Sequence, residues 1–348
     1  MAYTTIDKPS DYFNTKLYTG AGSELAVSGV GFSPSMTWFK QRDTTRGHVL
    51  EDIVRGAGNT LFPNTTDGET TGGYYLTSFD SDGFTLPTSN VGTNASGGSY
   101  VSWNWKAGTS FTNDASATGI GSIDSSGSVN TDAGFSIVKW TVGSAVNGLA
   151  VAHSLGVAPK IIIYKRTNSS SDWYVWLNKV IDSSQDYLVL NTTSAKVDIN
   201  SGTYGIPSST LISNFGFANT EMIAYCFAEK QGYSKFGSYT GNGNADGTFI
   251  YTGFKPAFVM SKRTDSTENW YMKDNKRDIF NPVDNALYAN SSAAELTDWG
   301  GATTDYLSNG FKLKTTDSAH NASGGTYIYM AFAENPFVSS TGVPACAR

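Results

Sequence analysis

Two acidic–basic pairs stand out among the residues that could do chemistry in this 348-residue chain. Asp52 precedes Arg55 by three residues, and Asp274 precedes Arg277 by the same distance. A carboxylate and a guanidinium that meet in a bidentate pair fix the geometry of the loop that carries them. We therefore expect two turns held by Asp–Arg pairs. A polar binding patch is the alternative for the same residues.

One segment resembles a metal-binding loop. Residues 242–247, NGNADG, match the first half of a calcium loop, with oxygen-bearing side chains at positions one, three and five and then a glycine. Gly253 stands at the twelfth position, where such a loop needs an acidic residue. Asn and Gly are also ordinary hairpin residues. We favour a plain turn at Asn242, Asn244 and Asp246 and keep calcium, the one cofactor that the sequence suggests, as the alternative.

Aromatic side chains in or near loops could stack on sugar rings. A carbohydrate-binding face needs apolar ring faces together with oriented polar groups, and Asn and Asp residues would supply the latter. Packing in the core or between repeats is the interpretation that we favour for these aromatics. The candidate ligand-binding residues are Tyr74, Tyr75, Trp176, Trp299, Asp305 and Tyr306.

The chain lacks the local motifs of several enzyme classes. It contains no Gly-Xaa-Ser-Xaa-Gly, no Gly-rich phosphate loop followed by Lys and no His-Glu-Xaa-Xaa-His. The three histidines, His48, His153 and His320, are isolated in the sequence, and no pair of acidic residues stands out by its spacing as a glycosidase would require. We predict a protein that is not an enzyme and has no catalytic residues.

A pattern of proline, strand and cation occurs three times and organises the chain. Proline fixes φ and lacks a donor, so it suits the first position of a strand, and the residues that follow are aromatic or β-branched. Further landmarks recur around each pattern, which indicates three copies of about 95 residues. The proline and the lysine six residues later are Pro34 and Lys40, Pro159 and Lys165, and Pro256 and Lys262.

Each copy continues with a ring eight residues after the lysine and ends in a strand of alternating apolar residues. His48 occupies the ring position that Trp173 and Trp270 occupy in the other copies, so we expect His48 to pack. A period of two with one large apolar face predicts a half-buried strand of a sandwich. The apolar faces are Val101, Trp103 and Trp105; Ile223, Tyr225 and Phe227; and Ile328, Met330 and Phe332.

We predict an all-β protein built from three tandem, similar antiparallel β-sandwich repeats of jelly-roll or lectin-like type. The share of charged residues is only 16%, and many Gly, Ser, Thr and Asn residues suit an all-β protein with many turns. A tight pseudo-threefold arrangement of the copies and an asymmetric row are both open. The expected divisions are an N-terminal arm or anchor at 1–17, repeats at 18–108, 135–230 and 231–335, a Gly/Ser-rich linker or extra hairpin at 109–134, and a C-terminal tail at 336–348.

Charge and composition exclude several other classes. The formal net charge of −6 argues against a nucleic-acid binder, which usually needs a basic face. No segment reaches the roughly 18 apolar residues of a membrane span, and the N-terminus has no basic region followed by an apolar stretch. The two cysteines, Cys226 and Cys346, do not suggest a disulfide framework. We expect synthesis in a reducing cytoplasm.

Three stretches of the chain resemble a known family. YFNTKLYTG…GVGFSP near the start, GYSKFGSYTGNGNADGTFIYTGFKPAFVMSKR in the middle and NGFKLKTTDSAHNASGGTYIYMAFAENPF near the end are similar to repeat proteins of tailed bacteriophages, especially phages of marine bacteria. The members are structural, tail-fibre-like or uncharacterised proteins. The resemblance covers nearly the whole chain and brings no catalytic residues. The second copy departs most, since it has Gly205-Ile206 where the others have Gly-Phe.

The resemblance implies a structural protein of the virion, made in the host cytoplasm and displayed as a tail-fibre or receptor-binding component that adheres to the host. A head-decorating knob or fibre, plugged into the capsid through Met1 to Lys16, is the alternative, and a carbohydrate-active tailspike enzyme is the least favoured. The expected partners are other virion proteins, further copies of the chain in a homo-oligomer, for which we guess a trimer, and a host-surface carbohydrate or protein. We expect neither nucleic acid nor a membrane span.

Overall fold

The sheets of the computed structural model consist of antiparallel strands, and the predicted all-β fold class is confirmed. The structure describes residues 3–88, 90–144, 149–199, 204–214, 217–298 and 300–344. Short helical turns connect some of the strands: η1 (Pro9–Asp11), α1 (Ala115–Thr118), η2 (Gly300–Ala302) and α2 (Ser318–Asn321).

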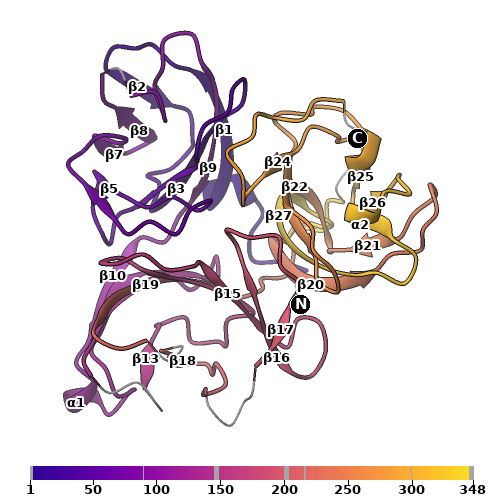
Figure 1. The fold of residues 1–348 in the computed structure, drawn as a ribbon. Coiled ribbons are helices and arrows are strands. Elements are labelled where there is room, and N and C mark those ends of the chain that lie inside the picture. Colours follow the sequence, from indigo (N-terminus) through magenta and orange to yellow (C-terminus); the bar gives the residue numbers. More distant parts are fainter. Residues whose placement is uncertain are drawn as a thin grey trace.

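Three main sheets share one order of strands. In each, the strand that closes a copy lies between the strand that opens the copy and the strand that follows the repeated proline or, in the third copy, contains it. Figure 1 shows these sheets in three lobes, coloured indigo to purple, magenta to red, and orange to yellow. The matching strands are β1 (Phe13–Thr19), β9 (Ser99–Trp105), β3 (Met36–Gln41) and β4 (Val49–Asp52); β12 (Phe135–Val142), β19 (Thr220–Phe227), β14 (Ile161–Arg166) and β15 (Tyr174–Asn178); and β20 (Ser234–Thr240), β27 (Thr326–Pro336), β22 (Phe254–Arg263) and β23 (Trp270–Asp274).

Further strands widen two of the main sheets, and smaller sheets lie beside all three. The second main sheet gains β10 (Thr109–Asn113) and β11 (Ser125–Asn130) at one edge and β16 (Gln185–Val189) and β17 (Val197–Asp198) at the other, while β24 (Leu287–Tyr288) ends the third. The smaller sheets contain β2 (Leu25–Ser28), β8 (Gly83–Leu86) and β7 (Ser78–Asp80); β13 (Ala150–Ala152) and β18 (Leu211–Ser213); β21 (Phe249–Tyr251), β26 (Gly310–Leu313) and β25 (Thr304–Leu307); and β5 (Asn59–Thr60) and β6 (Thr70–Thr71).

The strand that closes the first copy is buried on both faces, so its predicted half-buried state was wrong. Ser102 and Asn104 on its polar face are as fully buried as the tryptophans on the other face. The smaller sheet covers this polar face, where Phe84 packs edge-on against Phe39 with ring centroids 4.9 Å apart. Asn104 keeps a hydrogen-bond partner there, because its Nδ2 donates to the carbonyl of Asn14 at 3.1 Å. Burial of a polar residue is tolerated when such a partner is present.

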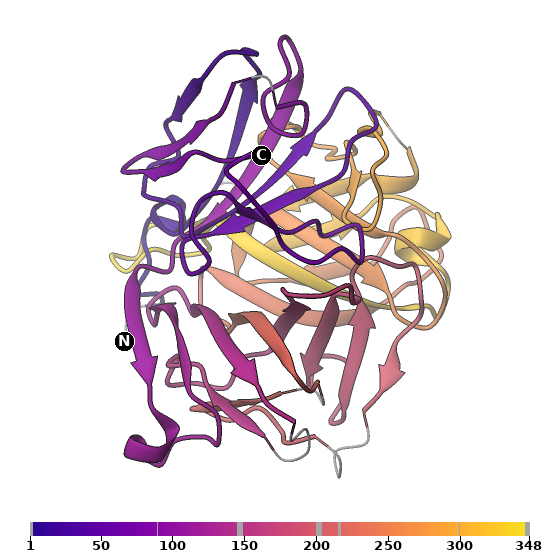
Figure 2. The same ribbon diagram turned by 60° about the vertical axis from the view of Figure 1, so that its left-hand side comes forward.

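The opposite faces of the three main sheets meet in one hydrophobic cluster. At its centre, the ring of Phe332 stacks on Phe13 at 4.9 Å and contacts Trp105 at 5.7 Å and Phe227 at 6.1 Å. Phe258 joins the group, 5.6 Å from Phe13. We call these five residues the central aromatic cluster. They come from all three copies, so the copies surround a shared core and do not form a row; the turned view in Figure 2 shows the third copy, in orange and yellow, beside the other two.

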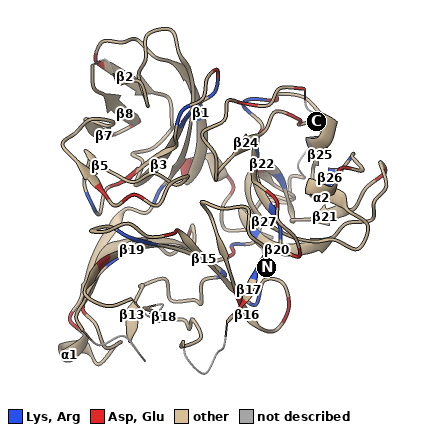
Figure 3. Cartoon of the chain, viewed as in Figure 1, with Lys and Arg blue, Asp and Glu red and all other residues tan. Residues whose placement is uncertain are grey.

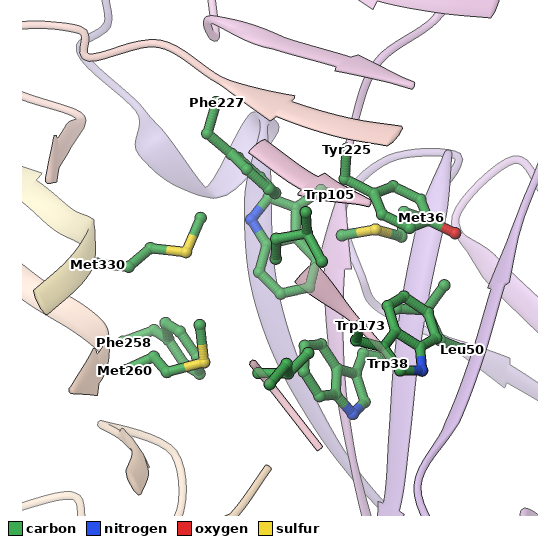
Figure 4. A pocket seen from close by; sticks show the side chains of 12 residues that line it. Met36, Trp38, Leu50, Trp105, Trp173, Tyr225, Phe227, Phe258, Met260 and Met330 are labelled. Carbon is green, nitrogen blue, oxygen red and sulfur yellow. The ribbon is translucent and has the colours of Figure 1, made fainter. Parts of the chain in front are cut away.

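A small cavity of about 10 Å³ remains next to this cluster and is lined by apolar side chains from all three copies. Figure 4 shows Phe258, Met260 and Met330 on one side of it and Trp105 and Phe227 on the other. An apolar cavity of this size offers no hydrogen bonds to a water molecule and therefore stays dry. We assign the cavity to packing of the core and not to ligand binding.

The predicted N-terminal arm at 1–17 needs correction over its described residues. β1 begins at Phe13, five residues before the expected start of the first copy, and Phe13 lies in the central aromatic cluster. Upstream of it, Thr4 Oγ1 donates to the carbonyl of Gln231 at 2.8 Å, and the Tyr3 hydroxyl donates to the carbonyl of Gly253 at 2.7 Å. Residues 3–16 therefore belong to the folded body and contact its third copy.

The structure also places residues 109–134 and the described part of the C-terminal tail. Of the two alternatives for residues 109–134, the structure has the extra hairpin, because β10 pairs with β11 and β11 pairs with β12. In the C-terminal tail, the backbone N–H of Ser340 donates to the carboxylate of Asp7 at 2.6 Å, so the described part of the tail lies against the N-terminal residues. Cys226 is buried in β19, whereas Cys346 lies outside the described residues.

We predict that Phe332→Ala destabilises the whole chain, because this ring contacts residues of all three copies. Truncating a buried phenylalanine removes its transfer free energy and leaves a cavity, at a cost of about 3–5 kcal/mol. Urea unfolding followed by tryptophan fluorescence measures this. The control is Phe280→Ala, at a side chain that is 74% exposed, and it should change the free energy of unfolding by less than about 0.5 kcal/mol. Equal effects of the two variants would contradict a shared core.

Candidate functional site

Each copy makes the same backbone contacts with its neighbour. The amide two residues before the repeated ring position donates to a carbonyl of another copy, and the pairing runs from first to third, second to first and third to second copy. A contact that recurs in this cyclic order is the signature of a pseudo-threefold arrangement. The pairs are Arg46 N with Ser292 O, Ser171 N with Thr66 O, and Glu268 N with Thr193 O, each at 2.8 Å.

The ring position itself donates a hydrogen bond to the neighbouring copy in the same order. Trp173 Nε1 donates to the carbonyl of Phe62 and Trp270 Nε1 to that of Val189, both at 3.0 Å. In the first copy His48 replaces the tryptophan, and its Nε2 lies 2.8 Å from the carbonyl of Tyr288. A histidine nitrogen that bonds a carbonyl must carry the proton, so His48 reproduces the tryptophan N–H.

His48 is fully buried and holds its neutral form. Its Nδ1 accepts a hydrogen bond from Trp38 Nε1 at 2.8 Å, which requires this nitrogen to be unprotonated. Burial, assisted by the charge of Lys40, lowers the pKa of His48 to about 3. His48 is therefore a packing residue at a junction between copies and has no free nitrogen for catalysis.

The three repeated lysines are buried beside the same junctions and donate to backbone carbonyls. Lys40 Nζ reaches the carbonyl of Gln41 at 2.7 Å, and Lys165 Nζ reaches those of Ser171 at 2.6 Å and Thr66 at 2.9 Å, the last in the first copy. Burial lowers the pKa of both lysines to about 8, and that of Lys262 likewise to about 8. Lys165 thus ties a loop of its own copy to a loop of the first copy.

The two predicted Asp–Arg pairs form, and each holds a turn. Arg55 Nε lies 2.6 Å from Asp52 Oδ2, and Arg277 Nε lies 2.6 Å from Asp274 Oδ2. The second oxygen of Asp52 accepts the backbone N–H of Arg55 at 2.9 Å, and that of Asp274 accepts the N–H of Arg277 at 3.0 Å. All four side chains are buried, so the pairs are shielded from water and salt.

A second acidic residue completes each pair. Glu69 bonds Arg55 Nη1 at 2.8 Å, and Glu295 bonds Arg277 Nη1 at 2.7 Å. Burial alone would lower the pKa of Arg55, but the negative charges of Asp52 and Glu69 raise it, so this guanidinium stays charged. Neither glutamate was among the residues predicted from the sequence. The sequence does contain a signal for them. Glu69 and Glu295 each lie five residues after the repeated asparagine of their copy, and the second copy, which has no Asp–Arg pair, has Lys196 at this position.

Both pairs also bind the closing strand of another copy. The Tyr225 hydroxyl donates to Asp52 Oδ2 at 2.8 Å, and Trp103 Nε1 donates to Asp274 Oδ2 at 3.0 Å. The guanidinium of Arg277 lies 5.6 Å from the centre of the Trp103 ring, within range of a cation–π contact. We call these two clusters the ionic junctions. At the third junction the matching residues are Leu177, Val180 and Met330, all buried and apolar.

The charged groups of the ionic junctions bond to one another and to the neighbouring copy, and so hold the copies together. Each carboxylate already accepts several hydrogen bonds, and each guanidinium is bonded to two acidic side chains. No hydroxyl, thiol or imidazole activated as a nucleophile lies among the contacts of these described residues. The predicted turns held by Asp–Arg pairs agree with this geometry. The structure adds that both pairs contact another copy, which was not predicted.

Among the described residues, the candidates for sugar binding do not form one site. Trp176 and Tyr306 have no exposed surface, so neither can stack on a ligand. Tyr75 is half-buried against Phe62, with ring centroids 5.5 Å apart. Tyr74 is 60% exposed but stands by itself. The remaining candidates are Asp305, which is half-buried on β25, and Trp299, which lies outside the described residues.

The oxygens of the calcium candidate are engaged within the chain. Asn242 Oδ1 accepts from the backbone N–H of Asn244 at 2.9 Å and from Asn321 Nδ2 at 2.9 Å, and Asn244 Oδ1 accepts from the N–H of Asp246 at 3.0 Å. Asp246 forms an ion pair with Lys312 at 2.6 Å. These bonds describe consecutive Asx turns, which the Asn- and Asp-rich sequence favours on its own.

An open polar groove of about 800 Å³ lies where the β10–β11 hairpin approaches Val54 of the first copy. Asp114 Oδ1 accepts from the N–H of Ala117 at 3.0 Å and Asp124 Oδ1 from that of Ala115 at 2.8 Å, so both carboxylates hold the α1 turn. Hydroxyl groups and one cation line the groove together with the apolar residues Val54, Ile123 and Trp140, and the hydroxyls suit hydrogen bonding to an uncharged polar ligand. The polar lining residues include Thr112, Ser122, Ser126, Lys139 and Thr141.

Charged residues elsewhere are spread over the molecule. Figure 3 shows short acidic and basic segments of both signs among long uncharged stretches. Among the described residues, no cluster of three or more His, Cys, Asp or Glu side chains has the geometry to hold a metal ion.

A family model described as Domain of unknown function (DUF7483) matches residues 8–336. The chain belongs to this family. The match spans all three copies and both ionic junctions. The searches of curated proteins and of solved structures gave no match for this DUF7483 chain. Within the part of the chain that the structure describes, no helix is both long and apolar enough to cross a membrane.

We predict that Arg277→Val costs about 3–5 kcal/mol of stability, because it leaves Asp274 buried without its counter-charge. The double variant Asp274→Leu/Arg277→Val installs the residue types of the second copy, removes both charges and should cost less than the single change. Chemical unfolding of the two variants in parallel measures this. A double variant that is as unstable as the single one would contradict our assignment of the junction.

We predict that His48 makes the DUF7483 chain less stable in acid. The folded-state pKa of about 3 lies below the value of 6.5 of an ordinary histidine. The unfolded chain therefore binds more protons between these two values, and the free energy of unfolding falls as pH falls through this window. In His48→Gln, the slope of that free energy against pH between pH 6.5 and 4 should become smaller. The control Tyr74→Ala, at an exposed side chain, should keep the parental slope.

Proposed function

We propose that this protein is a non-catalytic, surface-displayed structural component of a tailed-bacteriophage particle, where it serves as a tail-fibre or receptor-binding part that adheres to the host. One observation carries the proposal: the buried Asp–Arg pairs are engaged in the ionic junctions between copies. The body is therefore fixed from inside, and its loops and outer sheets are left for contact with other molecules.

We further propose that each copy is a small β-sandwich of jelly-roll or lectin-like type. What supports this is that each main sheet faces a smaller sheet across a hydrophobic cluster of its own. Phe84 and Leu86 lie in the cluster of the first copy, Ile162 and Ile212 in that of the second, and Phe311 in that of the third. A sandwich with a core of this kind is a stable platform for exposed loops.

Display on a particle fits a rigid body with weak contact surfaces. Many chains of this protein on one particle turn weak single contacts into firm attachment, because later contacts form at a high effective concentration. The polar groove between the β10–β11 hairpin and the first copy is one surface available for such contacts. Synthesis in the host cytoplasm and assembly with other virion proteins, and with further copies of the chain, are part of this proposal.

The tail is favoured over the head by the placement of the N-terminal residues. Attachment to a capsid through an arm from Met1 to Lys16 would need that arm to leave the body. Instead Tyr3 and Thr4 bond to the third copy, and Phe13 lies in the central aromatic cluster. The described part of the segment is thus occupied within its own chain, so we propose the adhesive location on the tail.

We predict that an electron cryo-microscopy map of the particle whose genome encodes this chain places the protein on the tail. The purified protein should bind host cells in a co-sedimentation assay, with light scattering on the same sample to count the chains in each assembly. Density on the capsid with none on the tail would overturn the adhesive assignment. Release of sugars from host polysaccharide by the purified protein would overturn the non-catalytic one.

A further inference from the structure

Two aromatic side chains on the edge strand β21 point away from the core. Phe249 and Tyr251 are 43% and 52% exposed, whereas Ile250 between them is buried. Alternate residues of a strand project from one face, and their Cα atoms lie about 6.7 Å apart. The two rings therefore lie side by side on the outer face of the β21–β26–β25 sheet, which belongs to the right-hand lobe of Figure 1.

Charged groups of both signs surround these rings on the same face. Lys312 pairs with Phe249 across the strands, and Asp305 pairs with Lys312 on the next strand. Lys312 Nζ lies 2.6 Å from Asp246 Oδ1, which keeps the amine beside the ring of Phe249. Donors and acceptors thus stand within reach of any molecule that covers the two rings.

The ring of Tyr251 is held in place from the side. Its hydroxyl lies 3.3 Å from the hydroxyl of Tyr3, which itself donates to the carbonyl of Gly253 at 2.7 Å. Tyr3 in turn packs edge-on against Phe337, with ring centroids 6.3 Å apart. A ring that is fixed before a ligand arrives loses little conformational entropy on binding.

The first copy provides an internal comparison. Its β2 strand pairs with β8 in the same register as β21 pairs with β26, since Val27 opposes Phe84 as Ile250 opposes Phe311. Ala26 and Ser28 occupy the positions that correspond to Phe249 and Tyr251. The sheet therefore folds without aromatic residues at these two positions, and the exposed rings of the third copy are not required for packing. Grouped exposed apolar residues of this kind mark contact surfaces.

We propose that Phe249, Tyr251, Asp246, Asp305 and Lys312, which we call the aromatic platform, bind a neutral saccharide. The C–H groups of a sugar ring carry a small positive charge and pack on the negative face of an aromatic ring. The hydroxyls of the same sugar bond to the carboxylates and the amine beside the rings. The balance of charges on the platform favours an uncharged glycan over a polyanion. This inference rests on the proposed adhesive function and names its ligand class.

The test is an array of linear oligosaccharides of glucose, galactose, mannose and N-acetylglucosamine, probed with the full-length protein, followed by calorimetric titration of the best-bound sugar. The double variant Phe249→Ala/Tyr251→Ser installs the residues of the first copy. It should weaken binding by about tenfold or more and leave the melting temperature unchanged. The control Phe280→Ser removes a ring outside the platform that is 74% exposed, and this variant should bind like the parent.

Three results would overturn the inference: no sugar on the array bound by the parent, binding unaffected by the double variant, or binding lost equally in the control. If the parent is an oligomer and the double variant is a monomer with unchanged sugar binding, the rings form a contact between chains and not a sugar site. The outcome is separate from that of the particle map. If the protein binds sugar through these rings but is absent from the tail, the proposed location is wrong. The assignment of the aromatic platform as a sugar-binding site would still hold.

Discussion

The fold depends on burying both faces of the three central sheets. A sheet in a small sandwich has to be buried on one face only, and the smaller sheets bury that face of each main sheet. The other faces carry Trp105, Phe227, Phe258 and Phe332, which pack together in one cluster, so the copies cover one another. Since apolar area removed from water is the main source of stability, one copy by itself would lose much of what holds it together.

The second copy explains how the ionic junctions can vary. Where the first and third copies have aspartate, arginine and glutamate, it has Leu177, Val180 and a lysine, and the facing residue is Met330 in place of a tyrosine or tryptophan. A buried ion pair is replaced without loss only when all its charged members change together. The differences between copies are thus one coupled exchange and not a set of independent substitutions.

Sequence reasoning predicted the features that depend on local pattern and missed those that depend on distant packing. The all-β class follows from turn residues and periods of two, and the Asp–Arg turns follow from a three-residue spacing. By contrast, Ser102 and Asn104 looked solvent-facing, because the sheet that covers them comes from elsewhere in the chain. Trp176 and Tyr306 looked like loop aromatics for the same reason. Phe249 and Tyr251 escaped notice since, with Ile250, they read as one apolar run.

The placement of Phe13 sets the order in which the chain can finish folding. This residue is made well before Phe332, on which its ring stacks. Tyr3 and Thr4 likewise await their partners in the third copy. Domains generally fold from the N-terminus during synthesis. The face of the first copy that carries Phe13 and Trp105 is therefore exposed to water until the other copies have been made, and the shared core is completed only after Phe332 has been made.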